Sequence, residues 1–292
     1  MKASAFAYAR ATSIDNALQL LASREQGAKV MAGGQSLMPA MNLRLISPDI
    51  VVDIGGLSEL KGTAVQGQVL RIGALTRHVD LLRSSEIAAH APLLAEAAAH
   101  VAHPAIRNRG TIGGSLAHAD PAAELPACML ALDATIVARG SHGERRIAAA
   151  DFFTGIFETA LMADELLVAI EAPIARKNSA HFFHEFSRRR GDYAIAGLAV
   201  QAVVEGGRFA TLRLVYFALG DRPALAKAAD RLINITVTPA LVQQASAALA
   251  EELHPHEDQQ ASNAMRHHLA RVLLTRAVAA LLHRPELAGA KP

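Results

Sequence analysis

Two glycine-rich stretches, MAGGQSLMPAMNLRL at residues 31–45 and RNRGTIGGSLAHADP at residues 107–121, decide how this chain folds around a ligand. Each sets a Gly-Gly pair among small polar residues rather than in a tight turn between alternating strands. Neither ends in Gly-Lys-Ser/Thr, as a P-loop does, and neither is the Gly-x-Gly-x-x-Gly that opens a helix in dinucleotide-binding folds. They therefore predict a ligand-binding backbone of another kind.

The paired glycines at positions 33, 34, 113 and 114 are expected to adopt positive φ and to leave no Cβ between backbone and ligand. Successive N–H groups in such loops converge on an oxyanion, and the hydroxyls of Ser36, Thr111 and Ser115 add donors. We therefore expect two phosphate-binding loops that together hold a pyrophosphate. Backbone dipoles or a neighbour such as Lys29 would compensate the charge. The pairs at 55–56 and 206–207 are predicted to be simple turns.

The carboxylate of Asp120 follows the second stretch, in AHADPAAEL, which also offers His118 and Glu124. A carboxylate beyond a phosphate loop is suited to accept hydrogen bonds from ribityl or ribose hydroxyls. It is equally suited to cap a helix that begins near Pro121, so Asp120 has two compatible roles.

Composition limits the class of protein. A chain of 292 residues suggests two domains, one of them divided, and 51% hydrophobic with 19% charged residues is typical of a globular protein. No run of about 18 apolar residues and no signal-peptide order is present, so we expect a cytoplasmic location. A net charge of +2, 4% aromatic residues and no tryptophan argue against nucleic-acid binding.

The single cysteine, Cys128, cannot form an internal disulfide or, alone, hold an iron–sulfur cluster or a structural zinc. Any metal redox centre is therefore expected on another chain. The histidine pairs at 100 and 103, and at 181 and 184, have i, i+3 spacing, but no acid or cysteine cluster completes either pair. In a strand, that spacing points the second pair to opposite faces. We expect no metal site.

Periodicity and capping residues predict the main elements. Near the N-terminus we expect a helix capped by Ser13, a strand entering the first stretch, a short helix at 37–43 and a strand at 49–54. A second unit starts with a strand of hairpin type at 69–76 and contains a helix at 91–102, the second stretch, and a helix, turn and strand over 123–140. After a linker at 173–180, two alternating strands at 196–205 and 209–220 precede two helices capped at Thr238 and Ser262.

The sequences AGGQSLMPAMNLRL and HPAIRNRGTIGGSLAHADPAAELP, about eighty residues apart, resemble the two FAD-binding motifs of the medium subunit of the carbon monoxide dehydrogenase and xanthine dehydrogenase family of molybdenum hydroxylases. FSRRRGDYAIAGLAV, residues 186–200, resembles the start of that family's C-terminal flavoprotein domain. The resemblance covers essentially the whole chain. It implies an α+β fold: two small α/β subdomains clasping FAD, similar to the vanillyl-alcohol-oxidase (PCMH) type, then an antiparallel sheet with helices. The implied domains are 1–57, 58–176 and 177–292.

By motif position, the resemblance implies that Ala32 to Ser36 and Thr111 to Ser115 wrap the pyrophosphate and ribityl chain, with Asp120 on the flavin side. Tyr193 falls where the family often places an aromatic against the isoalloxazine ring, with a core aromatic as the alternative. Two leucines fall where apolar residues near the adenine are expected. The expected site for non-covalent FAD is Lys29, Ala32, Gly33, Gly34, Gln35, Ser36, Leu37, Thr111, Gly113, Gly114, Ser115, Ala117, Asp120, Leu161, Leu167 and Tyr193.

The resemblance further implies an electron-transfer subunit with no catalytic side chain of its own. A molybdopterin-binding large subunit would hydroxylate the substrate, and [2Fe-2S] clusters on a small subunit would pass electrons to FAD here. A dimer of heterotrimers is the expected assembly, and NAD, quinone and oxygen remain open as acceptors. The hydroxybenzoyl-thioester branch of the family is set aside, because its cysteine-bearing insertion is absent.

Two other classes remain as alternatives. A freestanding FAD-dependent oxidase or dehydrogenase would need a substrate pocket over the flavin within this chain. A serine acyl hydrolase would use Ser36 with His118 and Asp120, although the Gly-x-Ser-x-Gly elbow is missing. The triplet Arg188–Arg190 is either a solvated face or a basic rim near the flavin.

Overall fold

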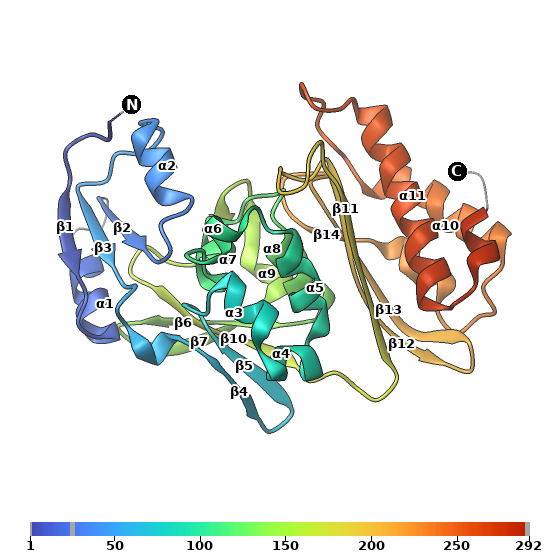
Figure 1. Cartoon of the computed structure of the whole chain (residues 1–292), viewed down its shortest axis with the longest axis horizontal. Helices are drawn as coiled ribbons and strands as arrows, with labels where there is room; N and C mark the ends of the chain where they lie inside the picture. The colour runs from blue at the N-terminus through green and yellow to red at the C-terminus, as the bar shows by residue number, and fades with distance from the viewer. Residues whose placement is uncertain (1, 24–26, 290–292) are drawn as a thin grey trace.

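The structure, a computed structural model, describes residues 2–23 and 27–289. The described residues form four sheets: three larger ones arranged in series, with the long C-terminal helices at one end (Figure 1), and one of only two strands. This is the α+β architecture expected from the sequence. Within the described ranges, no helix is long and apolar enough to cross a membrane.

The N-terminal sheet is a small parallel sheet with β3 (Ile50–Asp53) between β1 (Ala7–Arg10) and β2 (Ala28–Met31). Helix α1 (Ile14–Ala22) begins where predicted, with the Ser13 hydroxyl accepting the N–H of Asn16 at 3.1 Å. The apolar run of β3 is buried, as the central strand of a parallel sheet requires. The first glycine stretch therefore leaves the end of an edge strand, β2, and enters α2 (Leu37–Asn42).

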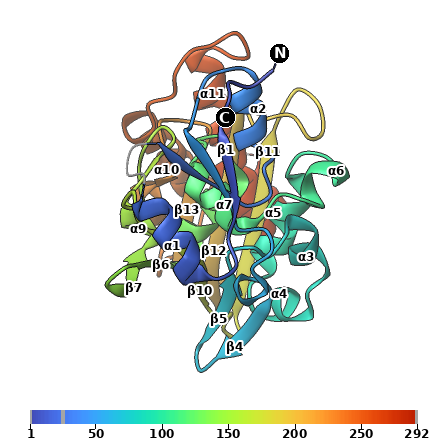
Figure 2. The same cartoon turned by 90° about the vertical axis from the view of Figure 1, so that its left-hand side faces the viewer.

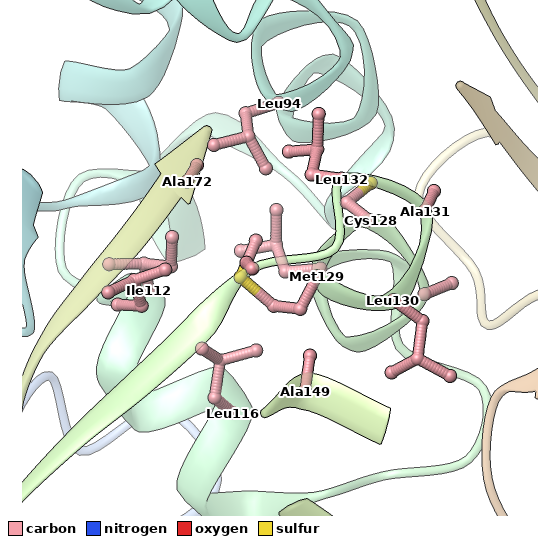
Figure 3. Close-up of a cluster of buried hydrophobic side chains, with 14 of the residues drawn as sticks. Leu94, Ile112, Leu116, Cys128, Met129, Leu130, Ala131, Leu132, Ala149 and Ala172 are labelled. Carbon is pink, nitrogen blue, oxygen red and sulfur yellow. The ribbon is translucent and has the colours of Figure 1, made fainter. Parts of the chain in front are cut away.

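The middle sheet is fully antiparallel, in the order β4-β5-β10-β6-β7. Helices cover one face, and their apolar side chains interdigitate around Met129 and Leu116 (Figure 3). The strands are β4 (Thr63–Gln66), β5 (Val69–Gly73), β6 (Thr135–Gly140), β7 (Gly143–Ala148) and β10 (Leu166–Pro173), with a short hairpin of β8 (Phe153–Gly155) and β9 (Glu158–Thr159). The helices are α3 (His78–Arg83), α4 (Ser85–His90), α5 (Pro92–His100), α6 (Pro104–Arg107), α7 (Ile112–His118), α8 (Glu124–Ala131) and α9 (Ala149–Phe152).

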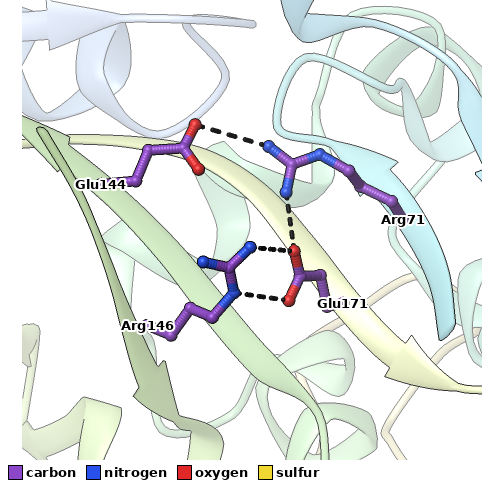
Figure 4. A network of polar contacts seen from close by, with 4 residues as sticks. All are labelled: Arg71, Glu144, Arg146 and Glu171. Atoms are coloured by element: carbon purple, nitrogen blue, oxygen red, sulfur yellow. Dashed lines mark hydrogen bonds and ion pairs between the residues drawn. The ribbon is translucent and has the colours of Figure 1, made fainter. Parts of the chain in front are cut away.

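On its other face the middle sheet packs against the N-terminal sheet. Val137 and Val168 share a core with Val52 and Ile54. On the same face the Glu171 carboxylate forms salt bridges with Arg71 at 2.8 Å and with Arg146 at 3.0 Å (Figure 4). Arg71 also forms a salt bridge with Glu144 at 3.7 Å. The hydrogen bonds from Arg146 and then from Arg71 hold the pKa of Glu171 below its usual value. These bonds join β5, β10 and β7 on one face of the sheet.

The C-terminal sheet is antiparallel, in the order β11-β12-β13-β14, and is buried on both faces. Alternate residues explain this: Ala199 and Val215 pack toward α5 and α8, whereas Leu198 and Tyr216 pack toward α11. The Tyr216 hydroxyl donates to the Ala270 carbonyl at 3.1 Å. The elements are β11 (Ser179–Phe186), β12 (Ala196–Glu205), β13 (Arg208–Phe217), β14 (Ala224–Leu225), α10 (Pro239–Glu252) and α11 (Asn263–Leu281).

Two local expectations were wrong. The second glycine stretch is the helix α7, not a loop. Helix α8 starts at Glu124, and Asp120 instead accepts the Ala122 N–H at 2.9 Å within a turn. The histidine pair noted in the sequence is divided between two elements, because His100 ends α5 while His103 precedes α6. The remaining caps, at Thr238 and Ser262, accept N–H groups as predicted.

Candidate functional site

A cavity of about 700 Å³ lies between the N-terminal sheet and the start of the middle domain. The first glycine stretch forms one wall, and residues 106–111, just before α7, form the other. Figure 2 turns the N-terminal sheet toward the viewer, with α7 behind β1. The lining residues are Met31, Ala32, Gly33, Gly34, Gln35, Met38, Pro39, Asn42, Asp53, Gly55, Lys61, Leu75, Arg77, Ile106, Asn108, Arg109 and Thr111.

The loop from Gly33 to Ser36 presents a row of free amides. Gly34 has the predicted positive φ, +71°, and the Gln35 side chain donates to the Gly33 carbonyl at 3.0 Å. Within the described ranges, the N–H groups of Gly33, Gly34, Gln35 and Ser36 donate to no acceptor. Backbone donors in a folded protein are nearly always paired, so this row is suited to an oxyanion.

The amides of the second stretch are already used. The N–H of Ile112 donates to the Thr76 carbonyl at 3.0 Å, that of Gly113 to the Ala74 carbonyl at 2.9 Å, and that of Gly114 to the Thr111 hydroxyl at 3.1 Å. Positive φ at Gly33, Gly113 and Gly114 was therefore a wrong expectation, and the amides of residues 112–114 are not free for an anion. The phosphate contacts implied for Thr111, Gly113, Gly114 and Ser115 stay predictions.

Close packing is what requires these glycines. A Cβ on Gly113 would stand 2.6 Å from the Ala74 Cβ, and one on Gly114 would stand 2.9 Å from the Thr111 hydroxyl. A Cβ on Gly33 would overlap the Arg109 carbonyl. The second stretch thus shapes the wall of the cavity and lets the first loop approach it.

Three cations line the same cavity as the row of free amides. Lys61, Arg77 and Arg109 line the cavity, and none of them forms a salt bridge with another described residue. The one lining carboxylate, Asp53, accepts the Tyr8 hydroxyl at 2.6 Å and the Gly55 N–H at 2.8 Å. Lys29, the cation expected from the sequence, is exposed on β2 and does not line the cavity. The cavity therefore combines free donors with positive charge.

A neutral histidine supports the wall formed by residues 109–111. The N–H of His78 donates to the Gly110 carbonyl at 3.0 Å, and its side chain lies beside the Gly110 backbone. The ring is buried, with a residue exposure of 5%, and neither ring nitrogen has a hydrogen-bond partner among the described residues. Burial lowers the pKa of His78 to about 4. The ring therefore stays uncharged near pH 7 beneath a basic cavity.

Two other predicted residues, Asp120 and Tyr193, lie beyond the C-terminal end of α7. Burial, and then the charges of Asp120 and Glu124, raise the pKa of Tyr193, so its hydroxyl lies within electrostatic reach of both carboxyls. The residue is nevertheless 63% exposed, which excludes the alternative of a core aromatic. The seven residues of α7 span about 10 Å. A ligand lying along α7 can therefore reach both the cavity and the Asp120–Tyr193 end.

The structure places the remaining candidates apart from the cavity. Leu167 is buried in the core of the middle domain, and Leu161 packs against that core from a loop held by the Arg145–Glu165 pair at 2.6 Å. Ser115 and Ala117 lie on α7, and Ser36 and Leu37 at the start of α2, outside the lining. The FAD contacts implied for these residues stay predictions.

The hydrolase alternative has no geometric support. Ser36 is exposed, and the cavity lining contains neither His118 nor Asp120. The ring of His118 instead lies 4.9 Å from that of Phe157, and burial lowers its pKa. No three His, Cys, Asp or Glu side chains of residues 2–23 and 27–289 gather in an arrangement that could hold a metal ion.

Sequence reasoning missed the three lining cations. Arg109 could have been found, because it lies inside the second stretch two residues before Thr111. Arg77 and Lys61 could not, since Arg77 reaches the site through a β-bridge to Thr111, and Lys61 follows a short 3-10 helix at Ser58–Leu60. A pyrophosphate is the anion that fits this donor set, which combines several amides in a row with three cations in one cavity.

Comparison with known proteins agrees with this geometry. Residues 4–175 match the family model described as the FAD binding domain in molybdopterin dehydrogenase, and residues 181–281 match the CO dehydrogenase flavoprotein C-terminal domain. The chain is 41% identical to the 6-hydroxypseudooxynicotine dehydrogenase complex subunit alpha of Paenarthrobacter nicotinovorans, over 97% of both chains.

Solved structures superpose over nearly the whole chain. A carbon monoxide dehydrogenase chain from Hydrogenophaga pseudoflava gives a TM-score of 0.95 at 35% identity, covering 97% of this chain and 99% of that one. A chain of quinoline 2-oxidoreductase from Pseudomonas putida gives 0.91 at 36% identity, covering 97% and 99%. The protein therefore belongs to the family of FAD-binding subunits of molybdenum hydroxylases, the oxidoreductases that include carbon monoxide and xanthine dehydrogenases.

Proposed function

We propose that this chain holds FAD between its first two sheets and relays electrons from partner subunits to an external acceptor. Bound FAD would supply the redox chemistry, since it accepts electrons one at a time and delivers two together. The chain's own residues bind and orient it. In the proposed assembly, iron–sulfur clusters and molybdopterin belong to partner chains, in line with the single buried cysteine here.

The observation that carries this proposal is that the free amides of Gly33, Gly34 and Gln35 belong to residues lining the same cavity as Lys61, Arg77 and Arg109. Among the described residues, these amides and that of Ser36 have no acceptor and the three cations have no salt bridge, so a bound anion would pair with both sets. A pyrophosphate in this cavity would place its two ligand halves on either side. One half would lie toward α2, and the other along α7 toward Asp120 and Tyr193.

The finer statements belong to the same proposal. We infer a dimer of heterotrimers with a molybdopterin-binding large subunit and a small subunit carrying two [2Fe-2S] clusters, located in the cytoplasm. A freestanding oxidase would need a substrate pocket over the flavin. The cavity lined by Gly33, Arg77 and Arg109 is suited to a diphosphate instead. The terminal acceptor is open among NAD, quinone and oxygen.

The test is FAD uptake by the purified chain. We expect about one FAD per chain, released by unfolding and therefore not covalent. A matched pair of variants, Arg109→Gln in the cavity and Lys29→Gln outside it, separates a specific site from general positive charge. A chain that takes up no FAD, or loses it equally in both variants, would contradict the proposal. Co-expression with the large and small chains, followed by mass measurement of the complex, tests the assembly.

A further inference from the structure

A buried arginine of the C-terminal domain joins three separate segments of the chain. Arg266 lies near the start of α11, and only 7% of its side chain is exposed. Its Nη1 donates to the carbonyl of Ile195 and, at 2.9 Å, to that of Ala218. Its Nη2 donates to the carboxylate of Asp258, in the loop between α10 and α11, at 2.7 Å. One guanidinium therefore holds the chain just before β12 and just after β13.

The first of these carbonyls lies at the base of the loop that carries Tyr193. This loop, residues 187–194, joins β11 to β12, and the N–H of Ile195 closes it by donating to the Phe186 carbonyl at 2.6 Å. Within the loop, the N–H of Asp192 donates to the Arg189 carbonyl at 3.0 Å. The loop is thus internally bonded, and the bond to the Ile195 carbonyl anchors it two residues after Tyr193.

The second carbonyl leads to the turn that carries Asp120. The N–H of Ala218 donates to the carbonyl of Pro121, the residue directly after Asp120, at 2.8 Å. Ala218 itself has a φ of +59°, a region that alanine rarely adopts and that persists only where the surroundings hold it. The Tyr193 loop and the Asp120 turn are therefore tied to each other through hydrogen bonds that meet at Arg266.

Stability alone does not account for an arginine at this place. The Nε of Arg266 is buried without a hydrogen-bond partner among the described residues, and its carboxylate partner, Asp258, is 49% exposed. Desolvating a charged group is costly, and well-packed apolar side chains in place of a buried ion pair are often at least as stable. Ala270 and Leu273, further along α11, are buried and apolar. What only arginine supplies is a rigid fork of donors for several acceptors at once.

We propose that Arg266 is a positioning residue for FAD: it fixes the Tyr193 loop against the Asp120 turn, so that the C-terminal domain closes the flavin end of the site. This inference rests on the proposed function, because it needs FAD to extend along α7 to Asp120 and Tyr193. Arg266 acts through the backbone of both segments and does not touch the cofactor itself.

The test is a double-mutant cycle on the full chain, with FAD affinity measured by titration. Tyr193→Ala should lower the affinity by about two- to tenfold, the loss expected for one aromatic contact. Arg266→Met keeps a long side chain but no donor, and it should lower the affinity to a similar extent, because Tyr193 is no longer held at the flavin. In the double variant the loss should be smaller than the product of the two single losses. A loss equal to that product, or wild-type affinity in Arg266→Met, would overturn the proposal.

Two further variants separate positioning from a general loosening of the domain. Tyr216→Phe removes the bond from the Tyr216 hydroxyl to the Ala270 carbonyl, which joins the same sheet to the same helix, and it should leave FAD affinity unchanged. Arg266→Lys should restore part of the affinity, because an ammonium group has donors for both carbonyls. The visible absorption of bound flavin should shift toward that of free FAD in Arg266→Met but not in Tyr216→Phe. An equal loss of affinity in Tyr216→Phe and Arg266→Met would contradict the positioning role.

Failure of this inference is distinguishable from failure of the proposed function. A wild-type chain that takes up no FAD contradicts the proposed function. A wild-type chain that binds FAD, with unchanged affinity in Arg266→Met, overturns the positioning role alone. Should Arg266→Met not fold, Asp258→Ala takes its place in the cycle, since it removes only the exposed end of the link. We expect a smaller loss of affinity that shrinks further in the Tyr193→Ala background, and wild-type affinity in Asp258→Ala would overturn the proposal.

Discussion

The α-carbon of Gly33 faces the carbonyl oxygen of Arg109 so closely that any side chain at Gly33 would overlap that oxygen. This contact joins the two glycine stretches, eighty residues apart in sequence, across one cavity. It explains why glycine is required at position 33 although φ there is not in the left-handed region.

Gly33→Ala should therefore separate the two walls. We expect FAD affinity to fall by about tenfold or more, because relieving such an overlap costs about 1–3 kcal/mol. Gly62→Ala is the matched control: its φ of +90° makes alanine strained there too, but nothing lies within 4 Å of the new methyl group. Fluorescence titration with FAD measures both variants. If folded Gly33→Ala binds FAD with wild-type affinity, the close approach of the two cavity walls is not needed for FAD binding.

The cations of the cavity should act additively on FAD binding. Neutralising Arg77, Arg109 or Lys61 singly, by replacement with glutamine, should weaken binding by about tenfold, since a hydrogen bond to a charged group contributes about 1.5–3 kcal/mol. Lys29→Gln should leave affinity nearly unchanged, because Lys29 is outside the lining. Titrations at low and high salt provide the check. If Lys29→Gln lowers FAD affinity as much as Arg109→Gln does, general positive charge rather than a specific binding site would explain the binding.

The elements that the sequence predicted are those with local signals. The Ser13 and Thr238 caps and the alternating strands β12 and β13 depend on neighbours in the chain, and they form as expected. The glycines of α7 were misassigned because close packing against Ala74 and the Thr111 hydroxyl selects glycine as strongly as positive φ does. The motif alone does not separate these causes.

The composition of the site was less predictable than its position. The first stretch lines the cavity with Ala32 to Gln35, because the loop follows directly from the end of β2. Arg77 and Lys61 come from the entry to the middle domain and reach the cavity only through long-range pairing. A single sequence carries no signal for such pairing. The FAD contacts of Leu161, Leu167 and Tyr193 stay predictions.

Acid should weaken the second wall through His78. Its pKa is about 4 in the folded chain against 6.5 for a free side chain, so the unfolded state binds more protons between these values. Stability is then highest above pH 6.5 and falls as pH drops toward 4, by about 3 kcal/mol in total. Urea unfolding at several pH values should show this loss in wild type.

The variant His78→Leu cannot take up that proton, and this part of the acid sensitivity should disappear. The control His142→Gln, which changes an exposed histidine, should retain it. FAD affinity should follow the same pH course as stability, because His78 supports Gly110 beside the cavity. If the free energy of unfolding of His78→Leu falls with acid as it does in wild type, groups other than His78 cause the loss of stability.

Tyr193 provides a test of the flavin end in the assembled enzyme. An aromatic that is 63% exposed contributes little to packing, so Tyr193→Ala should change the free energy of unfolding by no more than about 0.5 kcal/mol. With the partner chains present, reduction of the molybdenum centre by substrate should stay the same, since that centre belongs to another subunit. Reoxidation of the flavin should change, because an aromatic cover limits which acceptor and how much water reach the ring.

Tyr193→Phe is the control: it keeps the ring and should keep the reoxidation rate. A change in both variants would point to the hydroxyl near Asp120 instead of the cover. Rapid mixing of the reduced complex with oxygen separates these outcomes, and a normal flavin spectrum with unaltered reoxidation in Tyr193→Ala would remove Tyr193 from the site.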